Sequence, residues 1–210
     1  MRLRKKKWAR PELEKDPKVI FIPSEKKGKW HEVFGNDYPI HLELGCGRGS
    51  FITKLAGMNP KINYIAIDTY NELLVMVIRK LNDNDIENVR VVLMNIENIE
   101  ACFDQDEIDK IYINFCTPWP SNRHHRRRLT HPVFLKKYKT FIKEKAEIWF
   151  KTDDDELFAD SLKYFREAGF AELYRTDDLT RSDFENNITT EYEEKFIGQG
   201  IRIKFGIFGR

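Results

Sequence analysis

The sequence has no apolar run long enough to cross a membrane. A membrane-spanning helix needs about 18–20 consecutive apolar residues, and no run in this chain of 210 residues approaches that length. The N-terminus is basic but leads into no apolar signal region. We therefore expect a cytoplasmic protein with no membrane partner.

Cysteine and metal-binding patterns are also scarce. The three cysteines, Cys46, Cys102 and Cys116, have no metal-like spacing, and their odd number leaves no complete disulfide set. The five histidines form no H-x-x-x-H pattern. We expect reduced, buried cysteines and no structural metal.

The net charge is low, at +2, but the charge is segregated. Basic residues gather in two blocks, one at the N-terminus (Arg2, Arg4, Lys5, Lys6, Lys7 and Arg10) and one over Arg123–Arg128. Local basic patches on a nearly neutral protein fit a polyanionic partner. A solvated charged face explains the N-terminal block equally well.

Hydrophobic residues make up 41% of the chain and charged residues 33%, as in a globular protein. Strand-like segments alternate with helical ones, which predicts an α/β fold with a parallel sheet. We expect strands at 40–44, 64–67, 89–94, 108–115, 148–150, 170–175 and 200–208, the last two as an antiparallel pair at the sheet edge. We expect helices from about Ser50, over 72–81, over 132–143 and over 156–168. Residues 1–30 are expected to be a basic arm, mobile over 1–17, with an entry segment, and residues 31–210 a single domain.

A glycine-rich turn follows the first clear strand. Gly45, Gly47 and Gly49 permit positive φ and a close backbone approach to a ligand. Asp68 ends the next strand, where an acid can accept from ribose hydroxyls, and Asn95 ends the third. Glu43, two residues before the first glycine, would repel a pyrophosphate but suits an ammonium group. The pattern favours S-adenosylmethionine over NAD as the ligand.

Several motifs together resemble the bacterial tRNA (guanine-N7)-methyltransferase family. They are E-L-G-C-G-R-G from Glu43, P-W-P with R-H-H-R-R-R-L-T from Pro118, F-K-T-D-D-D-E-L-F from Phe150 and T-T-E-Y-E-E-K-F from Thr189. The resemblance runs over the whole chain in consistent order. It implies a Rossmann-like class I methyltransferase fold, with a seven-stranded, mostly parallel sheet and helices on both faces. It also implies S-adenosyl-L-methionine as cofactor and N7 of a guanine in the tRNA variable loop as the target.

The resemblance also implies site residues. Cofactor-contacting positions fall on Glu43, Asp68, Asn95 and Thr117, and substrate-binding positions on Ser121, Asp153, Thr190, Glu191, Tyr192 and Glu193. The residue patterns themselves add Gly45 and Gly47 as cofactor contacts and Arg123 and Arg126 as substrate contacts. Asp153 and Glu193 are the candidate catalytic carboxylates. The chain departs from the family at Thr117, where the family has an aspartate, and at Ser121, where a lysine is common.

Some of these residues also have simpler structural explanations. Asp153 is placed to cap a helix, and Thr190 with Glu193 has the spacing of a capping box. Trp119 between two prolines cannot join a regular ladder, so it either shapes the loop or stacks on a base. We expect Arg123, Arg126, Arg127 and Arg128 to contact phosphates rather than form a solvated loop.

Three functions remain open at this stage. The main prediction is tRNA methylation by a monomer or homodimer. The alternative is a tRNA-binding protein of the same fold that is weakly active or inactive, because Thr117 lacks the family's charge. A nicotinamide-dependent oxidoreductase is the third, and Glu43 argues against it.

Overall fold

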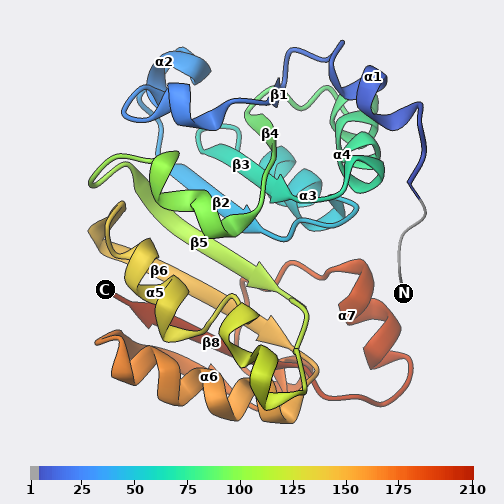
Figure 1. Cartoon of the computed structure of the whole chain (residues 1–210). Helices are drawn as coiled ribbons and strands as arrows, with labels where there is room; N and C mark the ends of the chain where they lie inside the picture. The colour runs from blue at the N-terminus through green and yellow to red at the C-terminus, as the bar shows by residue number, and fades with distance from the viewer. Residues whose placement is uncertain (1–4) are drawn as a thin grey trace. The chain divides into compact units, whose positions relative to one another are not determined.

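The computed structural model describes residues 5–210, whose elements are labelled in Figure 1. They form two compact units, one ending at Asp104 and the other running from Gln105 to Arg210. Arg2 and Arg4 of the N-terminal basic block lie outside the described residues. No helix within residues 5–210 has both the length and the apolar character of a membrane span.

Four parallel strands form the sheet of the first unit. Their order is β1 (Val19–Ile20), β4 (Val89–Leu93), β3 (Asn63–Asp68) and β2 (Ile40–Leu44). All five residues of β2 are buried, as in parallel strands covered on both faces. The three longer strands confirm the predicted ones, and the two-residue β1 was not predicted.

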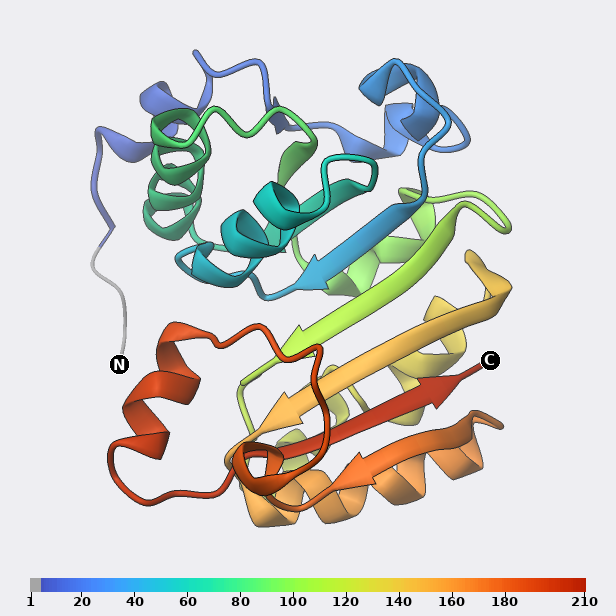
Figure 2. The ribbon, with the colours of Figure 1, turned by 180° about the vertical axis from the view of Figure 1, so that it is seen from behind.

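Two helices connect these strands and pack against β3, namely α3 (Ser50–Met58) and α4 (Asn71–Asp83). In Figure 2, α3 lies in front of β3. α4 confirms the helix predicted over 72–81, and its apolar residues at helical spacing, including Leu74, Val77 and Leu81, are buried. Shorter elements complete the unit: η1 (Pro23–Lys26), α2 (Trp30–Phe34) and the 3-10 helix η2 (Ile96–Ala101).

The N-terminal segment differs from the mobile arm that we expected over 1–17. Its helix α1 (Ala9–Leu13) packs against α4, and Ala9 and Leu13 are fully buried. Arg79 of α4 donates two hydrogen bonds to the Glu12 carboxylate, at 2.6 and 2.8 Å. Residues 9–13 therefore belong to the folded unit.

The second unit contains four strands in the order β5 (Ile108–Asn114), β6 (Ile142–Thr152), β8 (Lys204–Gly209) and β7 (Ala171–Thr176). β5 and β6 are parallel, whereas β8 is antiparallel to both β6 and β7. This confirms the predicted antiparallel pair at the edge. Residues 5–210 contain eight strands rather than the expected seven, and β1 is the additional one.

Two helices lie on one face of these strands, in front of them in Figure 1 and behind them in Figure 2. They are α5 (Pro132–Tyr138) and α6 (Asp155–Glu167). Phe165 of α6 stacks on Phe208 with ring centroids 3.8 Å apart, and Phe158 stacks on Phe150 at 6.1 Å. The remaining elements are η3 (Asn122–Arg127), η4 (Leu179–Arg181) and α7 (Glu191–Ile197).

The boundary between α5 and β6 was predicted wrongly. The helix ends at Tyr138 instead of residue 143, and β6 begins at Ile142 instead of residue 148. Ile142 pairs with Ile108 of β5, and the Phe141 carbonyl accepts from the amides of Glu107 and Ile108. Pairing with β5 therefore extends the strand through a charged stretch that sequence patterns assign to a helix.

Candidate active site

The glycine turn leaves open space beside the end of β2. Gly45, Gly47 and Gly49 all have positive φ, at 76°, 56° and 76°. A Cβ atom built on Gly45 or Gly47 meets nothing within 4 Å, whereas one on Gly49 lies 2.8 Å from Val77 Cγ2. The first two glycines thus leave room for a ligand, and the third permits close packing of α3 on α4.

Asp68 holds this turn in place. Its Oδ2 accepts from the Gly47 amide at 3.0 Å, and its Oδ1 accepts from the amides of Thr69 and Tyr70 at 2.6 and 3.1 Å. Burial raises the pKa of the Asp68 carboxyl, and these three amides offset part of that rise. A carboxylate offers about four acceptor sites, so one site remains for a ligand hydroxyl.

Two more predicted residues lie at the same end of the strands. The register pairs Leu44 with Ile67 and Asp68 with Leu93, which brings the carboxyl ends of β2, β3 and β4 together. Glu43 is buried in β2, with 2% of its surface exposed. Asn95 is exposed and caps η2 by accepting from the Glu97 amide at 3.0 Å.

The space beside the glycine turn, which we call the recess, is bordered by Glu43, Gly45, Gly47 and Asp68, and its charge is acidic. Burial raises the pKa of the Cys46 thiol far above its usual value, and the Asp68 and Glu43 carboxylates raise it further. Cys46 is therefore an un-ionised spacer in the turn, as predicted. An acidic recess beside open backbone matches a cationic ligand better than a pyrophosphate.

In the second unit, the Pro-Trp-Pro segment after β5 has an unusual backbone. Phe115 and Trp119 both have positive φ, at 49° and 45°, a conformation that non-glycine residues rarely adopt. The Arg127 guanidinium lies 5.0 Å from the centroid of the half-buried Trp119 ring, and the His124 ring lies 5.9 Å from it. These contacts favour a loop-shaping role for Trp119. The predicted site residues Thr117 and Ser121 lie exposed in the same segment.

The arginines after this loop divide into two groups. Arg123, Arg126 and Arg127 are exposed, as phosphate contact requires. Arg128, in contrast, is buried: its Nε donates to the Pro118 carbonyl at 2.6 Å, and its terminal nitrogens pair with Asp160 at 2.8 Å and Glu156 at 3.0 Å. The predicted phosphate contact by Arg128 is therefore wrong, because its side chain joins the Pro-Trp-Pro loop to α6.

The same network accounts for a group of potential metal ligands. His125, Glu156 and Asp160 offer ligand atoms within 4.8 Å of one another. The Arg128 guanidinium contacts all three of these side chains, including His125 Nε2 at 2.9 Å. A fixed protein cation thus already occupies the centre of this group.

The K-T-D motif ends β6 and leads into α6. Asp154, not Asp153, caps the helix, since its Oδ1 accepts from the Leu157 amide at 2.6 Å. The Asp153 carbonyl accepts from Lys204 Nζ at 2.8 Å. The Asp153 side chain is half-buried and makes no ion pair within residues 5–210, so its carboxylate is available to a ligand.

The Thr190–Glu193 segment forms the capping box that its spacing indicates. The Glu193 amide donates to Thr190 Oγ1 at 3.0 Å, and the Thr190 amide donates to Glu193 Oε2 at 3.4 Å. This box begins α7, whose residues Glu191 and Tyr192 are exposed. Tyr192 stacks on Phe115 and Phe196, with centroids 6.1 and 6.2 Å apart, and so presents an aromatic face at the end of β5.

Lys151 is a residue of this region that sequence reasoning missed. Its side chain is 4% exposed, and its Nζ pairs with Glu193 Oε2 at 3.1 Å. It also donates to the Ile188 carbonyl at 3.0 Å and to Asn187 Oδ1. The signal was available as a lysine that directly follows the apolar run Ile148–Phe150 near the end of a strand, where a buried charge must be paired.

Comparison with known proteins identifies the family. A family model described as "Putative methyltransferase" matches residues 37–205. The curated tRNA (guanine-N(7)-)-methyltransferase of Desulfitobacterium hafniense strain Y51 is 65% identical over 208 residues, which cover 99% of this chain and 96% of that protein. The chain belongs to the tRNA (guanine-N(7)-)-methyltransferase family.

Other similarities agree with this assignment. The tRNA (guanine-N(7)-)-methyltransferase of Clostridium tetani is 58% identical, covering 98% of this chain and 97% of that protein. The solved structure of a SAM-dependent methyltransferase from Aquifex aeolicus matches with a TM-score of 0.56 at 18% identity, covering 96% of this chain and 92% of that one. The structural match supports the Rossmann-like methyltransferase fold, and the family match establishes a methyltransferase.

Proposed function

We propose that this methyltransferase transfers a methyl group from S-adenosyl-L-methionine to N7 of a variable-loop guanine in tRNA. The observation that carries the cofactor proposal is the acidic recess of Glu43 and Asp68 beside the open turn at Gly45 and Gly47. The close relatives bear the name of this activity. A tRNA substrate places the reaction in the cytoplasm.

The recess fits the cofactor by charge and by its hydrogen-bonding groups. When bound, the cofactor supplies a methyl group on a positively charged sulfur. In our proposal, Glu43 binds the ammonium group, the open acceptor site of Asp68 takes one ribose hydroxyl, and Asn95 lies against the adenine. We also propose that the Thr117 hydroxyl contacts the cofactor, at a position where the family has a carboxylate.

The chemical task for the protein is alignment and charge stabilisation. N7 of guanine carries a free in-plane lone pair, so its attack needs no prior deprotonation. Catalysis then depends on holding the reacting atoms in line and on stabilising the positive charge that develops on the guanine. In an RNA duplex N7 lies in a deep, narrow groove, which favours a loop guanine as the target.

Of the two candidate carboxylates, Asp153 is the better placed to face the guanine. Both Glu193 oxygens are already bound, Oε1 by Asn187 at 2.6 Å and Oε2 by Lys151 at 3.1 Å. We propose that Asp153 stabilises the developing charge and that Glu193 and Thr190 fix the segment presenting Glu191 and Tyr192 to the substrate.

Exposed residues in and after the Pro-Trp-Pro loop are proposed to bind the tRNA. Arg123, Arg126 and Arg127 contact the tRNA backbone, and Ser121 lies beside the bound nucleotide where the family commonly has a lysine. Phosphate contacts of this kind make binding weaken with salt.

The test is methyl transfer from labelled S-adenosyl-L-methionine to unmodified tRNA, with calorimetry of the cofactor and of NADH alongside. We expect label in the tRNA, binding of S-adenosyl-L-methionine and no binding of NADH. Intact tRNA binding without label transfer would instead support the weakly active alternative. A large gain in rate in Thr117→Asp would show what the missing charge costs.

A further inference from the structure

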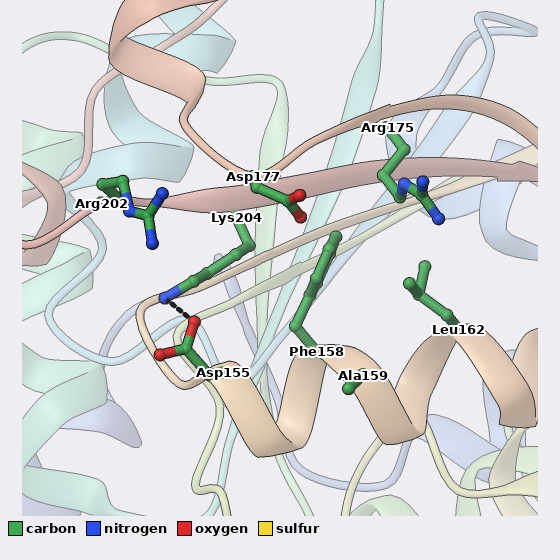
Figure 3. Close-up of a pocket in the computed structure, with 8 residues that line it drawn as sticks. All are labelled: Asp155, Phe158, Ala159, Leu162, Arg175, Asp177, Arg202 and Lys204. Atoms are coloured by element: carbon green, nitrogen blue, oxygen red, sulfur yellow. Dashed lines mark ion pairs between the residues drawn. The ribbon is translucent and has the colours of Figure 1, made fainter.

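An open polar pocket lies in the second unit, and none of its lining residues belongs to the Pro-Trp-Pro loop (Figure 3). It is an open groove of about 370 Å³ between α6, the end of β7 and the start of β8. Its charged lining residues are Asp155, Arg175, Asp177, Arg202 and Lys204, and Phe158 contributes an apolar wall.

The pocket adjoins the segment that carries Asp153. Lys204 Nζ donates to the Asp153 carbonyl at 2.8 Å. It also pairs with the Asp155 carboxylate at 2.6 Å, as Figure 3 shows. In the sheet, Thr152 pairs with Lys204, so the end of β6 and the start of β8 lie side by side. A ligand in this pocket would therefore lie close to the backbone of Asp153, the residue proposed to stabilise the guanine.

The pocket carries an excess of positive charge. Lys204 and Asp155 neutralise each other, which leaves two guanidiniums and the carboxylate of Asp177. Arg175 is exposed and has only a loose ion pair with Glu172, at 3.8 Å. Arg202 is exposed and makes no ion pair within residues 5–210. Two exposed guanidiniums on an open groove suit a phosphodiester, which they bind in a forked geometry.

Helix α6 lies between this pocket and the arginine segment Asn122–Arg127. Asp155, Phe158, Ala159 and Leu162 of α6 line the pocket, at the spacing of a single helix face. Glu156 and Asp160, on the neighbouring face, hold Arg128 and with it the arginine segment. A polyanion crossing the first turns of α6 would meet basic side chains on both sides.

We propose that this pocket binds a backbone phosphate of the tRNA, at a nucleotide other than the target guanine. This inference rests on the proposed function, since it takes tRNA as the substrate. The pocket adds Arg175 and Arg202 to the RNA-binding surface. The negative charge of Asp177 lowers the affinity of the pocket for the phosphate.

The test is to measure tRNA affinity across a range of salt concentrations for Arg175→Gln, Arg202→Gln and the double variant. Each lost phosphate contact should lower the slope of log affinity against log salt by about 0.7 to 0.9. Affinity should fall several-fold at low salt, the KM for tRNA should rise, and kcat should stay unchanged. Asp177→Asn should have the opposite effect and tighten binding.

The matched control is Arg181→Gln, an arginine of the same unit whose side chain is 88% exposed and which lies outside the pocket. Pocket variants that match this control in affinity and salt slope would overturn the inference. Failure of the proposed function would give a different result, because the wild-type protein would then transfer no methyl group to tRNA. The affinity measurement does not depend on catalysis and therefore tests the pocket separately.

Discussion

Replacing Lys151 by methionine tests the ion pair that fixes α7 to the end of β6. Methionine keeps most of the length of the side chain but removes its charge. The Glu193 carboxylate, 1% exposed, would lose the lysine at 3.1 Å and keep the side-chain amide of Asn187 and the backbone amide of Thr190. The Ile188 carbonyl would lose its lysine donor at 3.0 Å as well.

The expected loss is large because a buried charge is left without its partner. Removing one member of a buried ion pair costs about 3–5 kcal/mol. For a chain of this size each kcal/mol lowers the melting temperature by about 2–4 °C. Lys151→Met should therefore lower the melting temperature by about 6–20 °C.

The assay is urea and thermal unfolding at neutral pH, with Lys163→Met as the control. Lys163 pairs with Asp160 at 3.3 Å but is 67% exposed, so its loss should cost less than about 0.5 kcal/mol. Adding Glu193→Gln to Lys151→Met should recover part of the stability, because the unpaired charge is then gone. A cost for Lys151→Met as small as that of the control would refute the reasoning.

Three further predictions concern the glycine turn, Asp68 and Thr117. Gly49→Ala should destabilise the fold more than Gly45→Ala in urea unfolding, because only the former puts a Cβ 2.8 Å from Val77 Cγ2; equal losses would contradict this packing role. Burial raises the pKa of Asp68 above its ordinary value of 3.8. The protonated carboxyl therefore stabilises the folded state at pH values below the unfolded-state pKa, and this contribution is lost as pH rises through the folded-state pKa. Cofactor binding should show the opposite trend and tighten as pH rises through that pKa, because the ionised form is the better hydrogen-bond acceptor, and a pH-independent affinity in calorimetry would contradict it. Thr117→Asp should raise kcat without changing the melting temperature by more than about 2 °C, since Thr117 is exposed; an unchanged or lower kcat would show that no acid is needed there.

The sequence predicted the three longer strands and the two connecting helices of the first unit well because local patterns decide their structure. β2 and β3 are buried strands rich in apolar residues, β2 ends just before Gly45 and β3 ends at Asp68, and parallel pairing then places these ends together. The glycine spacing and the strand-end polar residues therefore indicated the cofactor recess. Parallel pairing alone does not show that Asp68 also holds the turn through Gly47, because that contact depends on side-chain geometry.

The second unit was harder because contacts distant in sequence decide it. Nothing in the run of arginines distinguishes Arg128 from its neighbours, and its burial depends on Glu156 and Asp160, which lie 28 and 32 residues later. Likewise, the role of Lys151 depends on Glu193, 42 residues away. Charged residues that pair across such separations look like solvated residues in a sequence.

The most direct test of the central claim is to identify the nucleoside that the protein modifies. Unmodified tRNA is incubated with protein and S-adenosyl-L-methionine, digested to nucleosides and analysed by mass spectrometry, and the modified position is mapped by strand cleavage at 7-methylguanosine. We predict 7-methylguanosine at a single guanine in the variable loop. Methylation of another guanine atom or another base, or no methylation by protein that binds both cofactor and tRNA, would contradict the account.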